Sequence, residues 1–179
     1  TTEGLTISGT GLSSTGALTN SSGTSATYSG LLTLGADATI KSSSGNIVLT
    51  NASTITGSTF ALTLDGTATG SSLASIIGTG TGTLTKAGTG TWTLSGTSTF
   101  TGSTTITGGT LSISADRNLG TAPGSATAGS INLSGGGQLL VTSGTSGSPT
   151  TLSTNRGIAL GTSGGVLSST AGNYLTYSG

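Results

Sequence analysis

The sequence predicts an all-β protein that folds as a parallel β-helix (a β-solenoid) with essentially no helix. Gly (34), Thr (41) and Ser (31) make up 59% of the 179 residues. Apolar residues recur at every second position in short segments, which is the signature of half-buried strands. Clusters of Gly, Ser and Asn separate these segments and form turns, because Gly adopts positive φ freely and Ser or Asn bonds to the local backbone.

The expected strands follow one another along the whole chain. No segment has the apolar spacing of three and four residues that marks an amphipathic helix. The strands centre on Leu5–Ile7, Leu32–Leu34, Ile47–Leu49, Leu62–Leu64, Leu84, Trp92–Leu94, Phe100, Ile106, Leu111–Ile113, Ile131–Leu133, Leu139–Val141, Ile158–Leu160 and Leu175–Tyr177.

The most regular stretch is Gly82–Ser114, in which an apolar cluster returns every six to eight residues. Strands this short, separated by one or two turn residues, are expected to wind into coils of roughly 20–24 residues with about three strands per coil. About eight such coils fit the chain. Leu, Ile, Trp and Phe would stack inside, whereas Thr and Ser would face water.

This stretch resembles the autotransporter-associated β-strand repeat, found in passenger regions of large secreted or surface proteins of Gram-negative bacteria. The matching residues are Leu84, Lys86, Gly88, Gly90, Trp92, Leu94, Gly96, Phe100, Gly102, Thr104, Ile106, Gly109 and Leu111. The chain departs from the commonest pattern at Ser98, which replaces an Asn, and at Phe100, which replaces a Tyr. The resemblance implies a right-handed parallel β-helix exported to the cell surface, with structural motif positions and no catalytic residue.

We expect residues 1–179 to be a single β-solenoid segment of a longer or polymeric protein, with its clearest repeat at 82–114. Thr2–Ser8 and Asn173–Gly179 at the two ends both look like strands. A solenoid normally ends in a cap that blocks the open backbone ladder. Either a larger protein was trimmed, or the ends abut other copies in a fibre. The export signal is expected to lie outside these residues.

The composition excludes several classes of function. Charged residues are 4% of the chain, the net charge is zero, and His, Cys and Met are absent. Four scattered cations do not neutralise enough phosphate for nucleic-acid binding. No apolar run approaches the roughly 20 residues of a membrane span, so we expect no membrane insertion by this segment. We therefore predict no enzyme activity, no catalytic, cofactor-binding or metal-binding residue, and no cofactor.

Four charged residues are candidates for a functional site. Asp116 and Arg117 could form an acidic–basic catalytic or calcium site, but Asp37 and Asp65 are too dispersed to complete a cluster, so a solvated loop is expected. Lys86 and Arg156 could bind anionic glycans, but the simpler expectation is an outward position that shields a strand edge.

The aromatic residues and the Asn-x-Ser sequons are expected to be structural. Trp92 lies in the alternation with Leu94 and is expected in the core rather than as a sugar-stacking platform. The tyrosines are too scattered for an aromatic binding stripe, and the sequons are a chance match in a Ser-rich chain. The tyrosines are Tyr28, Tyr174 and Tyr177, and the sequons begin at Asn20, Asn51 and Asn132.

Three Thr-x-Thr pairs raise the alternative of an ice-binding surface, because a flat Thr array on a β-helix can order water. The pairs are Thr83/Thr85, Thr91/Thr93 and Thr99/Thr101. Their eight-residue spacing is not one coil, so successive pairs should lie on different faces. Only the step from Thr83/Thr85 to Thr105/Thr107 has a coil-like separation.

The favoured function is a structural, non-catalytic segment of an extracellular bacterial fibre or long surface protein. Its expected partners are further copies stacked head to tail through uncapped coils, or covalent neighbouring repeats. The alternative is an adhesin passenger of an autotransporter that binds host or neighbouring-cell surfaces, with cell-surface glycans as its ligand class. A polysaccharide-degrading enzyme is the third hypothesis.

Overall fold

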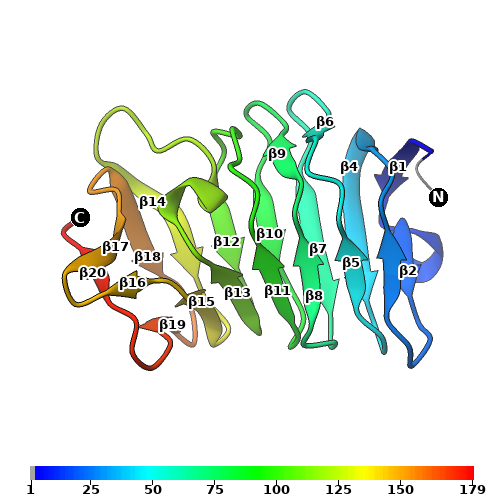
Figure 1. The fold of residues 1–179 in the computed structure, drawn as a ribbon. Coiled ribbons are helices and arrows are strands. Elements are labelled where there is room, and N and C mark those ends of the chain that lie inside the picture. The colour runs from blue at the N-terminus through cyan, green and yellow to red at the C-terminus, as the bar shows by residue number, and fades with distance from the viewer. Residues whose placement is uncertain (1–2) are drawn as a thin grey trace.

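The computed structural model describes residues 3–179 as a row of stacked coils that runs from one terminus to the other (Figure 1). Thr2, at the start of the first expected strand, lies outside the described residues. The solenoid has about seven turns, close to the about eight expected. Its only helical segments within residues 3–179 are two short 3₁₀ segments, η1 (Leu12–Ser14) and η2 (Asp116–Leu119).

Three sheets contain the strands. The ten-stranded sheet holds β1 (Leu5–Gly9), β2 (Leu18–Asn20), β4 (Leu32–Ser42), β6 (Thr54–Thr56), β7 (Leu62–Gly66), β9 (Ile76–Gly78), β10 (Leu84–Lys86), β12 (Thr104–Ile106), β14 (Thr127–Leu133) and β18 (Arg156–Leu160). The seven-stranded sheet holds β3 (Ala26–Tyr28), β5 (Ile47–Leu49), β8 (Ser71–Leu73), β11 (Thr91–Leu94), β13 (Thr110–Ile113), β15 (Gly137–Val141) and β19 (Gly165–Ser169). The three-stranded sheet holds β16 (Gly144–Thr145), β17 (Ser148–Leu152) and β20 (Leu175–Tyr177).

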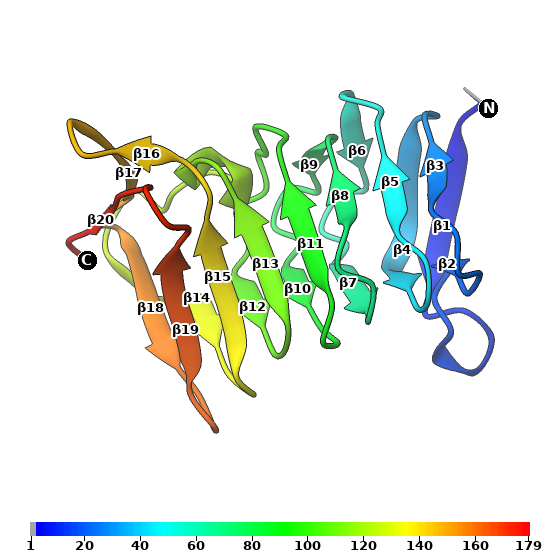
Figure 2. The same cartoon turned by 60° about the horizontal axis from the view of Figure 1, so that its bottom comes forward.

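The strand pairs of residues 3–179 are parallel except for the β16–β17 hairpin. The long strand β4 belongs to two faces, because its first part pairs with β1 and β6 and its second part with β2 and β7. The ten-stranded sheet thus covers two faces of the solenoid, joined through β4, and the seven-stranded sheet forms another face (Figure 2). We call the face that carries β1, β6 and β9 the third face.

The third face has no assigned strand in the middle of the stack, and there the sequence-based expectation for Phe100 is wrong. Phe100 lies outside any strand but is fully buried. Its N–H donates to Ile77 O (3.2 Å), and its carbonyl accepts from Thr121 N (2.9 Å). The backbone ladder thus continues through this residue with too few bonds to make a strand.

The core consists of columns of inward side chains that the parallel register places one above another. One column on the ten-stranded sheet contains Ile40, Leu64, Lys86, Ile106, Leu133 and Leu160. A column on the seven-stranded sheet contains Ser71, Trp92, Leu111, Leu139 and Leu167. Most members of these columns therefore pack on an apolar residue of the adjacent coil, and Lys86 and Ser71 are the polar exceptions.

Glycines at the corners let adjacent coils approach closely. Gly88 has φ +66°, and a Cβ built on it would overlap the carbonyl oxygen of Gly66 in the preceding coil. Gly102 is placed in the same way over the carbonyl of Gly82. The turn glycines of the repeat are thus required by stacking as well as by local conformation.

Candidate functional site

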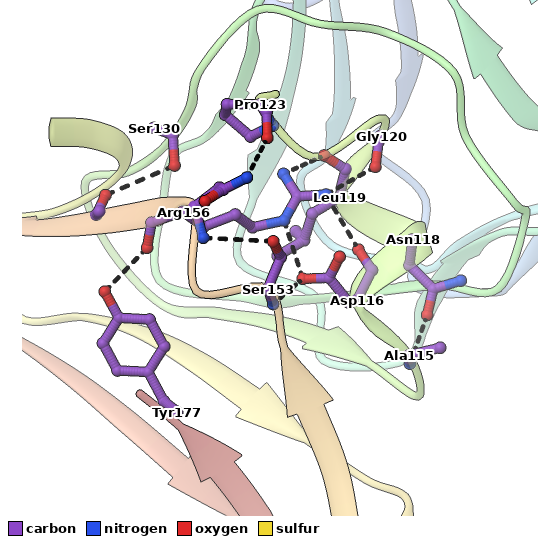
Figure 3. Close-up of polar contacts among 12 residues, drawn as sticks. Ala115, Asp116, Asn118, Leu119, Gly120, Pro123, Ser130, Ser153, Arg156 and Tyr177 are labelled. Atoms are coloured by element: carbon purple, nitrogen blue, oxygen red, sulfur yellow. Dashed lines mark hydrogen bonds and ion pairs between the residues drawn. The ribbon is translucent and has the colours of Figure 1, made fainter. Parts of the chain in front are cut away.

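Arg156, at the start of β18, lies inside the protein and not on its outer surface, so the expectation of an outward residue is wrong. Its side chain is 4% exposed. Nε donates to Asp116 Oδ1 (2.8 Å), and the two terminal nitrogens donate to Leu119 O (3.2 Å) and Gly120 O (2.6 Å) (Figure 3). A guanidinium at this depth requires such partners, because burial of an unpaired charge is costly.

Asp116 is the counterion, so it is not the freely solvated loop residue that the sequence predicted. Besides Arg156, its Oδ1 accepts from Ser153 N (3.1 Å). The turn that carries Asp116 is held by Asn118, whose Oδ1 accepts from Ser114 N (3.0 Å) and Ala115 N (2.9 Å). Arg117 is exposed as expected. The ion pair therefore joins η2 to the coil that follows it.

A groove lies beside this ion pair, and a bulge in β14 creates it. Thr127 pairs with Arg156 and Ile131 with Ile158, so four steps along β14 match two along β18. The extra residues include Gly129 at φ +68°. Bulges of this kind bend a strand away from its neighbour and are common beside functional sites.

We call this hollow the β14 groove, and its volume is about 390 Å³. It is lined by residues 101–103 and 127–130, together with Thr121, Pro123 and Arg156. The segment from 121 to 126, which leads into β14, projects from the stack (yellow-green in Figure 1). The sequence reasoning missed this site, although the run of Gly, Pro and Ser there marks a loop.

Lys86 occupies an inward position of the core column between Leu64 and Ile106, so the expectation that it faces outward is also wrong. It is fully buried. Its Nζ donates to the carbonyls of Ala87 (2.5 Å), Gly88 (3.0 Å) and Gly108 (3.1 Å), which matches the three protons of an ammonium group. Burial lowers the pKa of Lys86 from 10.5 to about 8, and the negative charge of Asp65 partly opposes that change.

Trp92 lies in the core as predicted, with no exposed surface and its Nε1 donating to Asp65 O (3.1 Å). The tyrosines do not form a stripe. The Tyr28 hydroxyl donates to Glu3 O, the Tyr177 hydroxyl donates to Arg156 O (2.8 Å), and Tyr174 is 51% exposed. These contacts place two of the three rings in structural roles.

The side-chain amides of the sequon asparagines are all hydrogen-bonded to backbone carbonyls. Asn20 Nδ2 donates to Thr24 O (2.8 Å) and Asn46 O (2.9 Å), and the residue is buried. Asn51 donates to Ser29 O (3.0 Å), and Asn132 donates to Gly129 O (2.7 Å). These bonds account for the three side chains as parts of turns.

The Thr-x-Thr pairs lie on different faces, as expected. Thr83/Thr85 borders or lies in β10 of the ten-stranded sheet, and Thr91/Thr93 lies in β11 of the seven-stranded sheet. The expected register is wrong, however, because Thr85 pairs with Thr105 and the partner opposite Thr83 is therefore Ser103. On the ten-stranded sheet Thr39, Thr63, Thr85 and Thr105 form one outward column, which ends at Asn132. On the seven-stranded sheet Thr93 lies between Ser72 and Ser112, so the second Thr-x-Thr pair does not extend into such a column.

The carboxylates lie apart. Asp37 Oδ1 accepts from Ala61 N (2.8 Å), and Asp65 forms an ion pair with Lys41 (3.1 Å). Within residues 3–179 no three His, Cys, Asp or Glu side chains gather as they would to hold a metal ion. In the same range no helix has the length and apolar character needed to cross a bilayer.

Comparison with known proteins identifies one segment. Residues 84–113 match the family model of the passenger-associated-transport-repeat. No curated protein and no solved structure matches the chain. The matched segment spans β10 to β13 and lies within the stretch 82–114 that the sequence singled out. The chain is therefore a β-solenoid that carries a passenger-type repeat, as the resemblance predicted.

Proposed function

We propose that this chain is a structural, non-catalytic segment of an extracellular or surface-exposed bacterial protein, in which it serves as a rigid rod. The observation that carries the proposal is the position of the passenger-associated-transport-repeat in the middle of an unbroken parallel stack. Its most specific side chains, Lys86 and Trp92, are buried and bonded to the protein itself. The repeat thus supplies core and corner residues to the rod.

Stacking beyond this segment is part of the proposal. Leu160 occupies an inward position of the core column next to Leu133, yet it is 66% exposed. A further coil would cover it and would pair with the open edge of β18. That coil comes either from a covalent neighbouring repeat or from another copy that stacks head to tail, and a contact of the second kind propagates because it does not close.

The β14 groove favours a second candidate, an adhesin passenger that binds the surface of a host or neighbouring cell. It is a hollow with polar hydroxyl groups on the side of the rod. The two roles are compatible in one protein, because a rod also positions a binding surface away from the cell.

Electron microscopy of the native material, with diffraction along the long axis, tests the rod. We expect long unbranched filaments with an axial reflection near ~4.8 Å, the spacing of strands in a stack. Discrete short rods attached to cells would favour the adhesin passenger. Antibodies against this chain should label intact cells, and labelling only after lysis would contradict the surface location.

The absence of catalysis is tested by incubating the chain with neutral and acidic polysaccharides, with and without calcium. We expect no new reducing ends, because the groove has no free carboxylate beside a hydroxyl group. Asp116 lies outside the lining and forms an ion pair with Arg156. Calcium-dependent cleavage would support the polysaccharide-degrading alternative.

A further inference from the structure

We propose that the β14 groove binds a neutral carbohydrate of about disaccharide size. The inference goes beyond the rod and stands without it, because it rests only on the geometry and chemistry of this groove. The volume of about 390 Å³ is at the lower end of the range of about 300–1,000 Å³ that small-molecule sites occupy.

The groove is preformed. Asn155 fixes the segment above it at two points, with Nδ2 donating to Pro123 O (2.8 Å) and its carbonyl accepting from Thr127 N (3.0 Å). The start of the segment is held by Thr121 N, which donates to Phe100 O (2.9 Å). A ligand therefore does not pay the entropy of ordering this loop.

The lining hydroxyls present acceptors to a ligand. Thr101 Oγ1 donates to Gly80 O (3.2 Å), Thr121 Oγ1 to Thr99 O (3.3 Å) and Thr127 Oγ1 to Ser125 O (3.0 Å). A hydroxyl has one proton and two lone pairs, so each of these groups has used its donor and keeps acceptor capacity. Ligand hydroxyl groups, which donate, complement such a surface.

The charge balance favours a neutral ligand over an anionic one. Arg156 lines the groove, but its charge is compensated by Asp116 at 2.8 Å, and its nitrogens also donate to Leu119 O and Gly120 O. Lys86 is buried in the core and lies outside the lining. The groove therefore offers no uncompensated cation to a sulfate, phosphate or carboxylate group.

The test is an NMR titration of the ¹⁵N-labelled 179-residue chain with cellobiose, maltose and lactose as neutral probes and with sialyllactose as the anionic probe. We expect saturable shifts from at least one neutral disaccharide at millimolar concentration, confined to the amides of residues 101–103, 121–122, 124–130 and Arg156, since Pro123 has no N–H. Sialyllactose should bind at least about tenfold more weakly. No shift with any of the three neutral probes, or a preference for sialyllactose, would overturn the proposal.

Matched variants locate the binding. Ser103 lines the groove, and Ser103→Tyr is designed to fill it. The control, Thr83→Tyr, introduces the same ring at the position opposite Ser103 in the preceding coil, which is outside the lining. We expect at least about tenfold weaker binding for Ser103→Tyr and unchanged binding for Thr83→Tyr. Ala128→Tyr, at an exposed position of the bulge, gives a second blocking variant should Ser103→Tyr fold poorly. Equal binding by the blocking variants and Thr83→Tyr would overturn the assignment.

Discussion

The coils of the passenger-type repeat are shorter than the coils that follow them. Leu94 pairs with Ile113, 19 residues later, whereas Val141 pairs with Ser169, 28 residues later. The short coils have glycine corners and a column of large inward side chains. The long coils accommodate η2, the segment over the β14 groove and the β16–β17 hairpin (Figure 2).

This difference in coil length indicates where a surface groove can form in such a solenoid. At a glycine corner such as Gly88 the preceding coil occupies the space that a side chain would need, so no hollow forms. In a longer coil the extra backbone leaves carbonyl groups that have no ladder partner. Arg156 satisfies those of Leu119 and Gly120, and the bulge in β14 leaves the groove beside it.

The largest effect is expected in the short coils. Trp92→Ala should lower the free energy of unfolding by about 3–5 kcal/mol, because it removes a fully buried ring between Ser71 and Leu111. Chemical denaturation followed by circular dichroism measures it. Thr93→Ala, on the exposed side of the same strand, is the control and should cost less than about 0.5 kcal/mol. Similar losses in both variants would contradict the alternation in β11.

The next effect belongs to the long coils. Arg156→Met should cost about 2–4 kcal/mol, because it leaves Asp116 and two buried carbonyl groups without their partner. The neighbouring Arg117→Met is the control, since Arg117 is exposed, and it should be nearly neutral. Urea unfolding of both variants compares them. A neutral Arg156→Met would mean that the ion pair does not hold η2 against β18.

Two glycines with a similar backbone conformation separate the effect of stacking from the effect of positive φ. Gly88 (φ +66°) and Gly136 (φ +73°) both adopt the left-handed conformation. A Cβ at Gly88 would also overlap the preceding coil, whereas nothing lies within 4 Å of a Cβ at Gly136. We expect Gly88→Ala to cost about 2–3 kcal/mol and Gly136→Ala about 1 kcal/mol. Equal melting temperatures for the two variants would show that stacking does not select glycine at this corner.

The smallest effect is a pH dependence in the short coils. The pKa of Lys86 is about 8 in the folded chain, whereas an unburied lysine has a pKa of 10.5. Between these two pH values the unfolded state therefore binds more protons than the folded state. The stability should therefore rise with pH, by about 1–2 kcal/mol from pH 7.5 to 9.5. Urea unfolding at the two pH values measures this rise.

Lys86→Met is the control for that pH dependence. It removes the titrating group and should flatten the profile. A fall in stability with rising pH in the unmodified chain would contradict the assignment. Lys86→Met also leaves the carbonyl groups of Ala87, Gly88 and Gly108 without their donor, so we expect a lower stability that no longer changes with pH.

The wrong expectation that Lys86 faces outward could have been avoided from the sequence, whereas the one for Arg156 could not. The alternation puts Leu84 inside and Thr85 outside, so period two already directs Lys86 inward, but the charge of the residue favoured an outward position. Its burial is possible because three carbonyls of the glycine corner converge on Nζ. No local pattern indicates that convergence for Arg156, whose carbonyl partners lie 36 and 37 residues earlier.

The sequence by itself determined the β-solenoid fold. Apolar residues at every second position between glycine-rich turns leave few alternatives to short strands that stack in parallel. The sequence also determined that Trp92 is core and that successive Thr pairs lie on different faces. Only the tertiary structure decided where the charges lie and that a groove exists. Those features depend on how the long coils register against their neighbours, and that register is set by the β14 bulge and by contacts between residues distant in the chain.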